Sequence, residues 1–286
     1  MSEDVANTVV VGAGVFGQTI GKALQEIGHK VIIMDSREPM AGSRPSACLM
    51  RPSWFASMGV QRYKPSLELL DRLYGVQDIR FDLWALKGTR VGSAAVHWCD
   101  PRKVLAGPVL LDKAISFQPA EGGWVIKTQG GRELSAANLI LAAGVWTNSL
   151  VNLPTLTGKV GVAFLFPEHK VPVPFILPWA PYKQVVAFNH PGGLWVGDGS
   201  AIKQSNWTEE HVVRSYKRCR DSIGIQDSAK ESRVRTIQGV RPYVSGLSNP
   251  CLLLKRPNNL WIATGGAKNG MVASGWAAGV IQHALR

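Results

Sequence analysis

Three glycines near the N-terminus have the residue spacing with the clearest chemical meaning in this sequence. Gly12, Gly14 and Gly17 form G-x-G-x-x-G directly after the apolar, β-branched run of residues 8–11. In such a loop the first glycine permits a tight turn, the second lets the backbone approach a pyrophosphate, and the third lets the following helix pack on the strand. The free N–H groups and the positive dipole end of that helix attract phosphates. The spacing therefore predicts a dinucleotide-binding loop.

An acidic residue completes this motif. A helical pattern of apolar residues follows the loop and ends at Gly28, and a second apolar strand covers residues 31–34. Asp35 stands at the end of that strand, where a carboxylate accepts hydrogen bonds from a ribose 2′-hydroxyl and disfavours the extra phosphate of NADP. A glycine-rich turn in an ordinary βαβ unit is the alternative. The complete order of strand, turn, helix, strand and acid favours the bound dinucleotide.

The composition sets the broad class of the protein. With 286 residues and 45% hydrophobic content, the chain is long enough for one large domain or for two that share a core. No apolar run approaches the length of about 20 residues that crosses a bilayer. The first strand begins within ten residues of Met1, which leaves no room for a signal peptide, so we expect a cytoplasmic protein. The six histidines are dispersed and the cysteines lack C-x-x-C spacing, so we expect reduced thiols and no metal.

The charge is strongly positive. Lys and Arg number 32 against 20 Asp and Glu, a net charge of +12. Residues 201–286 hold thirteen Lys and Arg against five Asp and Glu. Among them, Arg214, Lys217 and Arg218 have the spacing of one helix face within the helix expected over residues 208–222. This excess indicates a polyanionic partner such as DNA or RNA, and the alternative is a solvated surface that keeps the protein in solution.

Two later segments have the form of further cofactor contacts. Residues 139–146, LILAAGVW, are typical of a buried strand that ends in small residues, where the backbone can approach a large cofactor. Residues 260–277, LWIATGGAKNGMVASGWA, predict a strand, a short loop with Lys268 and a helix that opens at Gly270. Such a helix start presents N–H groups and a positive dipole to an electron-rich group such as a reduced isoalloxazine.

Together these motifs resemble one family. GAGVFG with Asp35, then LILAAGVW, GVRP at residues 239–242 and WIATGGAKNGM, in this order, are similar to the D-amino-acid-oxidase (DAO) family of flavoproteins, and most similar to its glycine oxidases. The resemblance covers residues 7–50 and 104–286. It implies non-covalent FAD rather than NAD, and oxidation of a C–N bond next to a carboxylate with O₂ as the acceptor.

The resemblance also implies the fold. An α/β, Rossmann-like FAD-binding domain would be interleaved with a smaller substrate domain built on an antiparallel sheet. The FAD domain would comprise residues 1–50, 104–155 and 251–286. Residues 51–103 and 156–250 would form the substrate domain.

Site residues follow by position from the same resemblance. Arg241 falls on the arginine that binds the substrate carboxylate, a role that suits the two-pronged guanidinium. Lys268 falls on the substrate side of the flavin, and Tyr243 shares the face of Arg241 if that segment is extended. The structural alternatives are a surface ion pair for Arg241 and a solvated loop lysine for Lys268. The residues expected to contact FAD are Gly12, Gly14, Phe16, Gly17, Asp35, Ser36, Arg37, Ser43, Arg44, Ala47, Cys48, Ala114, Ala143, Gly144, Trp146, Gly266, Lys268, Asn269, Gly270 and Met271.

The sequence departs from the family pattern in two places. Cys48 stands where the loop under the flavin normally has glycine, and it is either an inert small residue, which we favour, or a thiol beside the flavin. The segment between that loop and the strand at Val109 is also short for the family, which predicts a more open pocket and a larger substrate.

The sequence leaves three possibilities open for the function, two of which differ in the substrate. One is a glycine-type group attached to nucleic acid, because the flavin domain of the tRNA wobble-uridine modification enzyme belongs to this family. Another is a free small amino acid or N-methyl amino acid. The last is a non-catalytic FAD-binding subunit of a larger dehydrogenase.

Overall fold

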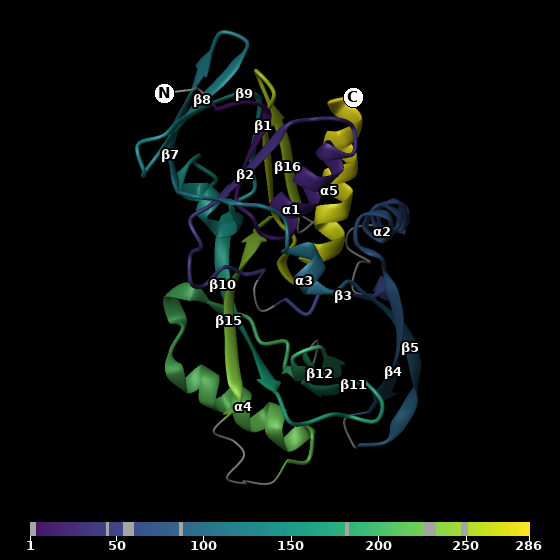
Figure 1. Cartoon of the computed structure of the whole chain (residues 1–286). Coiled ribbons are helices and arrows are strands. Elements are labelled where there is room, and N and C mark those ends of the chain that lie inside the picture. The colour runs from purple at the N-terminus through teal and green to yellow at the C-terminus, as the bar shows by residue number, and fades with distance from the viewer. Residues whose placement is uncertain are drawn as a thin grey trace.

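Two β-sheets, one above the other in Figure 1, form the framework of the protein. The structure is a computed structural model, and it describes residues 4–43, 46–53, 60–85, 88–180, 183–225, 233–246 and 251–286. Both termini lie in the part that contains the first sheet, and the long strands β10 and β15 extend from there into the second part (Figure 1). This arrangement brings segments that are far apart in sequence to the junction of the two sheets.

The first sheet carries the predicted βαβ unit. Its strands follow the order β16-β17-β9-β1-β2-β6, and β1 pairs in parallel with both β2 and β9. The β-branched run of β1 is buried on both faces, as is usual for a central parallel strand. A hairpin of β7 and β8 extends the sheet from β9. The strand bounds are β1 Asp4–Val11, β2 Val31–Asp35, β6 Leu110–Leu111, β7 Ala114–Ala120, β8 Gly123–Thr128, β9 Glu133–Leu141, β16 Cys251–Arg256 and β17 Leu260–Gly265.

Helices α1 (Val15–Gln25) and α5 (Gly270–Ala284) cover one face of this sheet, and α2 (Val60–Tyr74) packs against them. The apolar face predicted for the first helix is confirmed, because Ile20, Ala23 and Leu24 are fully buried among residues of α2, α5 and the sheet. None of the helices in the described part of the chain is long and apolar enough to cross a membrane.

The second sheet is built mainly of antiparallel pairs. Its order is β14-β10-β13-β12-β11-β4-β5-β3, and β15 pairs with β10 along almost its entire length. The strand bounds are β3 Leu49–Met50, β4 Gln77–Trp84, β5 Arg90–Trp98, β10 Leu156–Phe166, β11 Phe175–Ala180, β12 Lys183–His190, β13 Gly193–Gly197, β14 Ile202–Lys203 and β15 Arg235–Val244. The remaining elements are α3 Pro101–Val104, α4 Glu209–Ser222 and the 3₁₀ turns η2 Gly144–Ser149, η3 Gln204–Asn206 and η5 Ala267–Asn269.

One local expectation is settled by these elements. The helix expected over residues 208–222 is confirmed as α4, which begins directly after Thr208; the hydroxyl of that residue lies 2.8 Å from Nδ1 of His211. Strand β13 forms an antiparallel hairpin with the preceding strand β12. The division into a cofactor domain and a substrate domain stays a prediction.

Candidate functional site

The glycine loop between β1 and α1 is packed so closely that side chains are excluded. Gly12 has φ +105°, and a Cβ there would lie 2.5 Å from the carbonyl oxygen of Ala142. A Cβ at Gly17 would lie only 1.7 Å from the carbonyl oxygen of Gly12. Both distances are far below any real carbon–oxygen contact, so this turn and this approach of α1 to the strands require glycine.

Two side chains hold the start of α1. The backbone N–H of Val15 donates to Oγ of Ser43 at 3.0 Å, and the N–H of Ala13 donates to Oδ2 of Asp35 at 2.7 Å. The other carboxylate oxygen of Asp35 accepts from the N–H of Arg37 at 2.6 Å. Asp35 is therefore anchored beside the glycine loop, at the end of β2 where the sequence predicts it.

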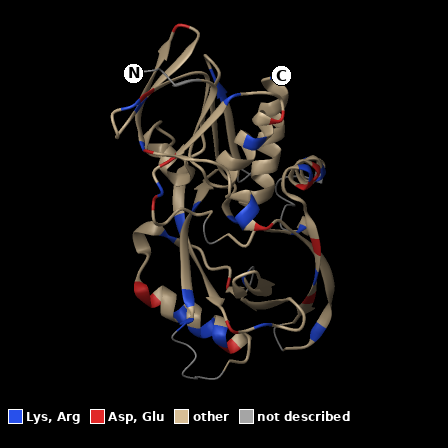
Figure 2. Cartoon of the chain, in the orientation of Figure 1, with Lys and Arg blue, Asp and Glu red and all other residues tan. Residues whose placement is uncertain are grey.

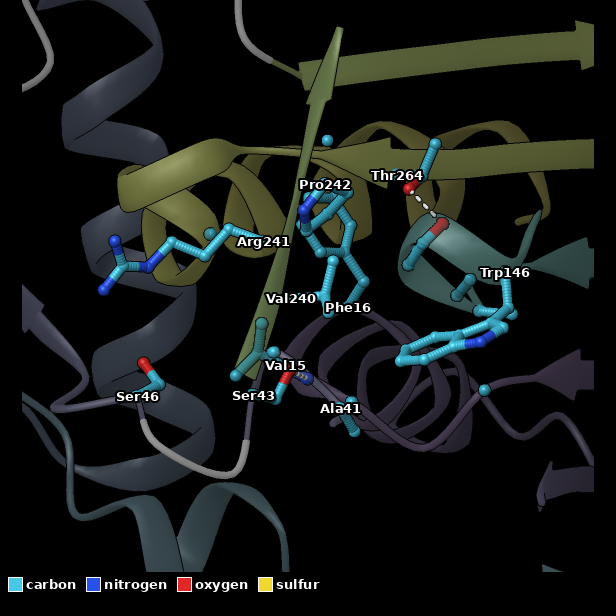
Figure 3. Close-up of a pocket in the computed structure, with 18 of the residues that line it drawn as sticks. Val15, Phe16, Ala41, Ser43, Ser46, Trp146, Val240, Arg241, Pro242 and Thr264 are labelled. Atoms are coloured by element: carbon cyan, nitrogen blue, oxygen red, sulfur yellow. Dashed lines mark hydrogen bonds between the residues drawn. The ribbon is translucent and has the colours of Figure 1, made fainter. Parts of the chain in front are cut away.

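A single large cavity connects this loop to the second sheet. Its volume is about 760 Å³, and it extends from Asp35 and Ala114 at one end to Arg241 and Lys268 at the other. Figure 3 shows Arg241 and Trp146 on opposite sides of β15, with Val15 and Phe16 of α1 between them. The predicted site residues that line it are Gly12, Gly14, Phe16, Asp35, Ser36, Ser43, Ala47, Cys48, Ala114, Ala143, Gly144, Trp146, Arg241, Tyr243, Lys268, Asn269 and Gly270.

Four predicted cofactor residues do not line this cavity. Gly17 and Gly266 lie at close backbone contacts, since a Cβ at Gly266 would meet Cα of Gly270 at 2.8 Å. Met271 is buried in the helix core, and Arg37 lines a smaller adjoining hollow beyond Asp35. Arg44 lies outside the described residues.

Most of the cavity wall that the second sheet supplies was not predicted from the sequence. Gln184, Val186, Trp195 and Gly199 line the cavity there, and no motif marks them. The loop after β2 also contributes residues 41 and 42 because it crosses β15: the N–H of Val240 donates to the carbonyl oxygen of Met40 at 2.8 Å. These positions depend on strand pairing, which local sequence does not reveal.

Arg241 projects from β15, and among the described residues most of its hydrogen-bonding capacity has no partner. Its Nη1 donates to the carbonyl oxygen of Ser200 at 2.9 Å. The guanidinium lies across Gly161, where a Cβ would come within 2.3 Å of Cζ. Within the described part of the chain, no carboxylate pairs with Arg241, so it does not form the surface ion pair that was the structural alternative. Burial lowers the pKa of Arg241, and the nearby Tyr243 and Asp198 oppose that shift.

Lys268 lies near Arg241 on the turn η5. Its Nζ would be 3.3 Å from a Cβ at Gly199. The side chain is exposed where it lines the cavity, yet the surrounding protein desolvates it and lowers its pKa, and the charge of Arg241 lowers it further. Tyr243 lines the same cavity, and Nζ of Lys159 sits 4.2 Å from the centre of its ring. This end of the cavity is therefore cationic and suited to an anion.

Cys48 lines the cavity as an inert thiol rather than a nucleophile. It is 2% exposed, and burial raises its pKa to about 12. Its Sγ lies 3.6 Å from Oγ of Ser46, and its φ of +50° is in the region that favours glycine. The thiol stays protonated at neutral pH, which favours the interpretation of Cys48 as a small filler at a glycine-like position.

The basic helix face predicted on α4 does not form as expected. Arg218 turns inward, where its Cζ lies 3.6 Å from the centre of the Trp179 ring and its Nη1 pairs with Asp198. Arg214 pairs with Glu210 at 3.4 Å. Figure 2 shows acidic residues at both ends of α4 beside its Lys and Arg. A buried carboxylate attracts one of the three cations, so the row is interrupted.

The residues around the cavity fit FAD. The glycine loop and the N-terminus of α1 offer backbone N–H groups for phosphates, and Asp35 lies beside them for a ribose. The same cavity also includes Cys48, Asn269 and Gly270, and its largely apolar lining suits an isoalloxazine. Within the described residues, no group of three or more His, Cys, Asp and Glu side chains could hold a metal ion.

Comparison with known proteins establishes the family. Residues 107–283 match the family described as DAO, FAD dependent oxidoreductase. This match covers more than half of the sequence, so the chain belongs to that family. It is an FAD-dependent oxidoreductase. A search of curated proteins finds no match.

Solved structures confirm the fold at low identity. Iminodiacetate oxidase from Chelativorans sp. BNC1 is 17% identical with a TM-score of 0.71, over 97% of this chain and 95% of that chain. Glycine oxidase from Geobacillus kaustophilus is 14% identical with a TM-score of 0.69, over 96% and 93%. L-proline dehydrogenase from P. horikoshii is 13% identical with a TM-score of 0.76, over 99% and 94%. The predicted Rossmann-like α/β fold is confirmed.

Proposed function

We propose that the protein oxidises the C–N bond of a small amine that carries a carboxylate on the carbon bonded to the nitrogen. The observation that supports this most is Arg241, a cation without a carboxylate partner in the described part of the chain, which lies in the same cavity as the glycine loop. A carboxylate is the natural counter-ion for such a guanidinium because both are planar and bond through two parallel contacts. The names of two structural neighbours, glycine oxidase and iminodiacetate oxidase, accord with this class of substrate.

The protein contributes mainly orientation to this reaction. When bound, FAD would accept the hydride, with its two electrons, from the C–H bond beside the nitrogen; the nitrogen also loses a proton, and the resulting imine hydrolyses in water. Arg241 holds the carboxylate, and Lys268 adds a second positive charge at the same end. The walls around Arg241 include Gln184, Trp195 and Gly199, and the described lining there contains no histidine or carboxylate that acts as a base. Fixing one C–H bond in place is enough for a large rate effect.

A glycine-type group attached to nucleic acid is the second candidate. The net charge of +12 favours it. The inward turn of Arg218 and the pairing of Arg214 count against a continuous polyanion surface on α4. We therefore place a free amino acid or N-alkyl amino acid first. O₂ is the acceptor we propose, and the more open pocket expected from the short segment before Val109 stays a prediction.

The decisive experiment follows bleaching of the flavin absorbance without oxygen. The amines form matched pairs that differ only in the carboxylate: glycine against methylamine, and sarcosine against dimethylamine. We expect bleaching only with the carboxylated member of a pair, and yellow FAD that heat or acid releases from the protein. Equal rates within the pairs would contradict the proposed function. An oligonucleotide with a glycyl-modified base, bleaching far faster than glycine, would move the proposal to the second candidate.

The affinity for carboxylates should fall as the pH rises, at pH values below the ordinary lysine pKa. The lowered pKa of Lys268 means that its charge is lost below 10.5, while Arg241 stays charged. Protonated Lys268 attracts a carboxylate and neutral Lys268 does not, so the dissociation constant of propionate should increase through that pH range. The change in flavin absorbance on titration with propionate measures it. The Lys268→Met variant should bind more weakly at neutral pH and lack this pH-dependent step, whereas the same step in the variant would assign it to another group.

A further inference from the structure

A fully buried carboxylate lies in the turn that follows β13, outside the cavity. Asp198 is 0% exposed. Its Oδ1 accepts from the N–H of Ser200 at 2.9 Å, its Oδ2 accepts from the Ser200 hydroxyl at 2.8 Å, and Arg218 forms an ion pair with it. A buried ion pair seldom stabilises a protein more than apolar residues of the same volume would. We therefore look for its role in the positions of the residues around it.

Arg218, the partner of Asp198, also has a second contact that fixes its position. Arg218 comes from α4 and stacks on Trp179 of β11, with Cζ 3.6 Å from the ring centre. The indole N–H of Trp179 donates to the backbone carbonyl of Asp198 at 2.9 Å. Two separate elements, α4 and β11, and the bonds within the turn itself thus fix residues 198–200 through one ion pair, one stack and three hydrogen bonds.

The other side of this turn faces the cavity. The carbonyl oxygen of Ser200 accepts the bond from Nη1 of Arg241, and Gly199 is the neighbour of the Lys268 ammonium. Arg241 is therefore held between Ser200 and Gly161, whose missing side chain leaves room for the guanidinium. A neutral carbonyl directs the guanidinium without neutralising it, whereas a carboxylate in that place would compete with the substrate.

We propose that Asp198 and Arg218 are positioning residues for Arg241, acting through the Ser200 carbonyl. This inference rests on the proposed function, because it assumes that Arg241 binds the substrate carboxylate. The ion pair sets the position of the turn, the turn sets the position of one oxygen atom, and that oxygen sets the direction of the guanidinium fork. Asp198 forms its ion pair with Arg218 and its hydrogen bonds with Ser200 of the same turn. It does not pair with Arg241, so the charge of Arg241 remains available to the substrate carboxylate.

The test uses the FAD-loaded enzyme and three variants. Asp198→Asn keeps the size of the side chain and loses the charge. Arg218→Met keeps an unbranched side chain and loses both the charge and the guanidinium stack on Trp179, and Arg218→Lys keeps the charge without the fork. Arg214→Met is the control, since it removes an exposed cation from the same helix. The readouts are the dissociation constant of propionate, kcat and KM for the carboxylated amine, FAD affinity and the melting temperature.

We expect Asp198→Asn and Arg218→Met to weaken propionate binding by about tenfold to a hundredfold, with FAD affinity unchanged. KM should rise more than kcat falls, Arg218→Lys should retain part of the affinity, and Arg214→Met should behave as the wild type. The double variant Asp198→Asn/Arg218→Met should be no worse than either single variant, because it leaves no buried charge without a partner.

Two results would overturn this inference. One is wild-type propionate binding in both Asp198→Asn and Arg218→Met. The other is a loss of propionate affinity that occurs only together with an equal loss of FAD. If Asp198→Asn does not fold, the two Arg218 variants decide the question. If Arg241→Leu itself binds propionate normally, then the proposed function is wrong. If Arg241→Leu loses propionate binding while Asp198→Asn binds it as the wild type does, only the positioning role of Asp198 is refuted.

Discussion

Replacing Arg241 by leucine should abolish amine oxidation and leave FAD bound. The guanidinium lies at the end of the cavity remote from Asp35, so its loss does not disturb the glycine loop. Truncating one partner of a desolvated, hydrogen-bonded charge pair costs about 2–5 kcal/mol, which corresponds to roughly 30-fold to 4,000-fold in kcat/KM. Steady-state oxygen consumption with the best carboxylated amine measures this loss, and the flavin absorbance per protein measures FAD.

Two controls make the Arg241 result specific. Arg241→Lys should recover little activity, since a point charge cannot form two parallel bonds to a carboxylate. Arg235→Leu, at the exposed start of the same strand, should retain activity because Arg235 does not line the cavity. Near-normal turnover by Arg241→Leu would show that another group binds the carboxylate, and the proposed function would lose its main support.

Replacing Gly17 by alanine should yield a protein without FAD. The added Cβ would lie 1.7 Å from the Gly12 carbonyl oxygen, so either α1 or the loop must move, and both belong to the expected phosphate site. Overpacking of this kind typically costs 1–3 kcal/mol of stability, and more where backbone atoms collide. The ratio of flavin to protein absorbance after purification measures the outcome, and circular dichroism measures the fold.

Neighbouring glycines provide a graded comparison for that variant. Gly14→Ala should disturb the fold less, because its Cβ would meet the Ser43 hydroxyl at 2.8 Å rather than backbone, but it should still weaken FAD binding, since this glycine lets the backbone approach the pyrophosphate. Gly279→Ala in α5 has nothing within 4 Å and should bind FAD normally, with a gain of about 1 kcal/mol in helix stability. Full FAD occupancy in Gly17→Ala would mean that the pyrophosphate does not depend on this turn.

Much of the cofactor site can be predicted from sequence because its signals are local. Gly12, Gly14 and Gly17 lie within six residues of one turn, and Asp35 follows after one helix and one strand. Spacing of this kind prescribes a backbone geometry whatever the rest of the chain does. Helix α4 with its Thr208 start, and the C-terminal strand and helix, were predictable for the same reason: apolar periodicity and capping residues act within a few positions.

The end of the cavity around Arg241 and Lys268, by contrast, depends on tertiary structure. Trp195 and Gln184 reach it through the pairing of β10, β12, β13 and β15, and Gly161 makes room for Arg241 only because these residues lie on adjacent strands. Periodicity placed Arg218 on a basic surface, but the buried carboxylate of Asp198 binds it inside the protein. Spacing along the chain determines what a turn or a helix face can do. Contacts between distant strands depend on register, and an ion pair forms wherever burial makes an isolated charge too costly.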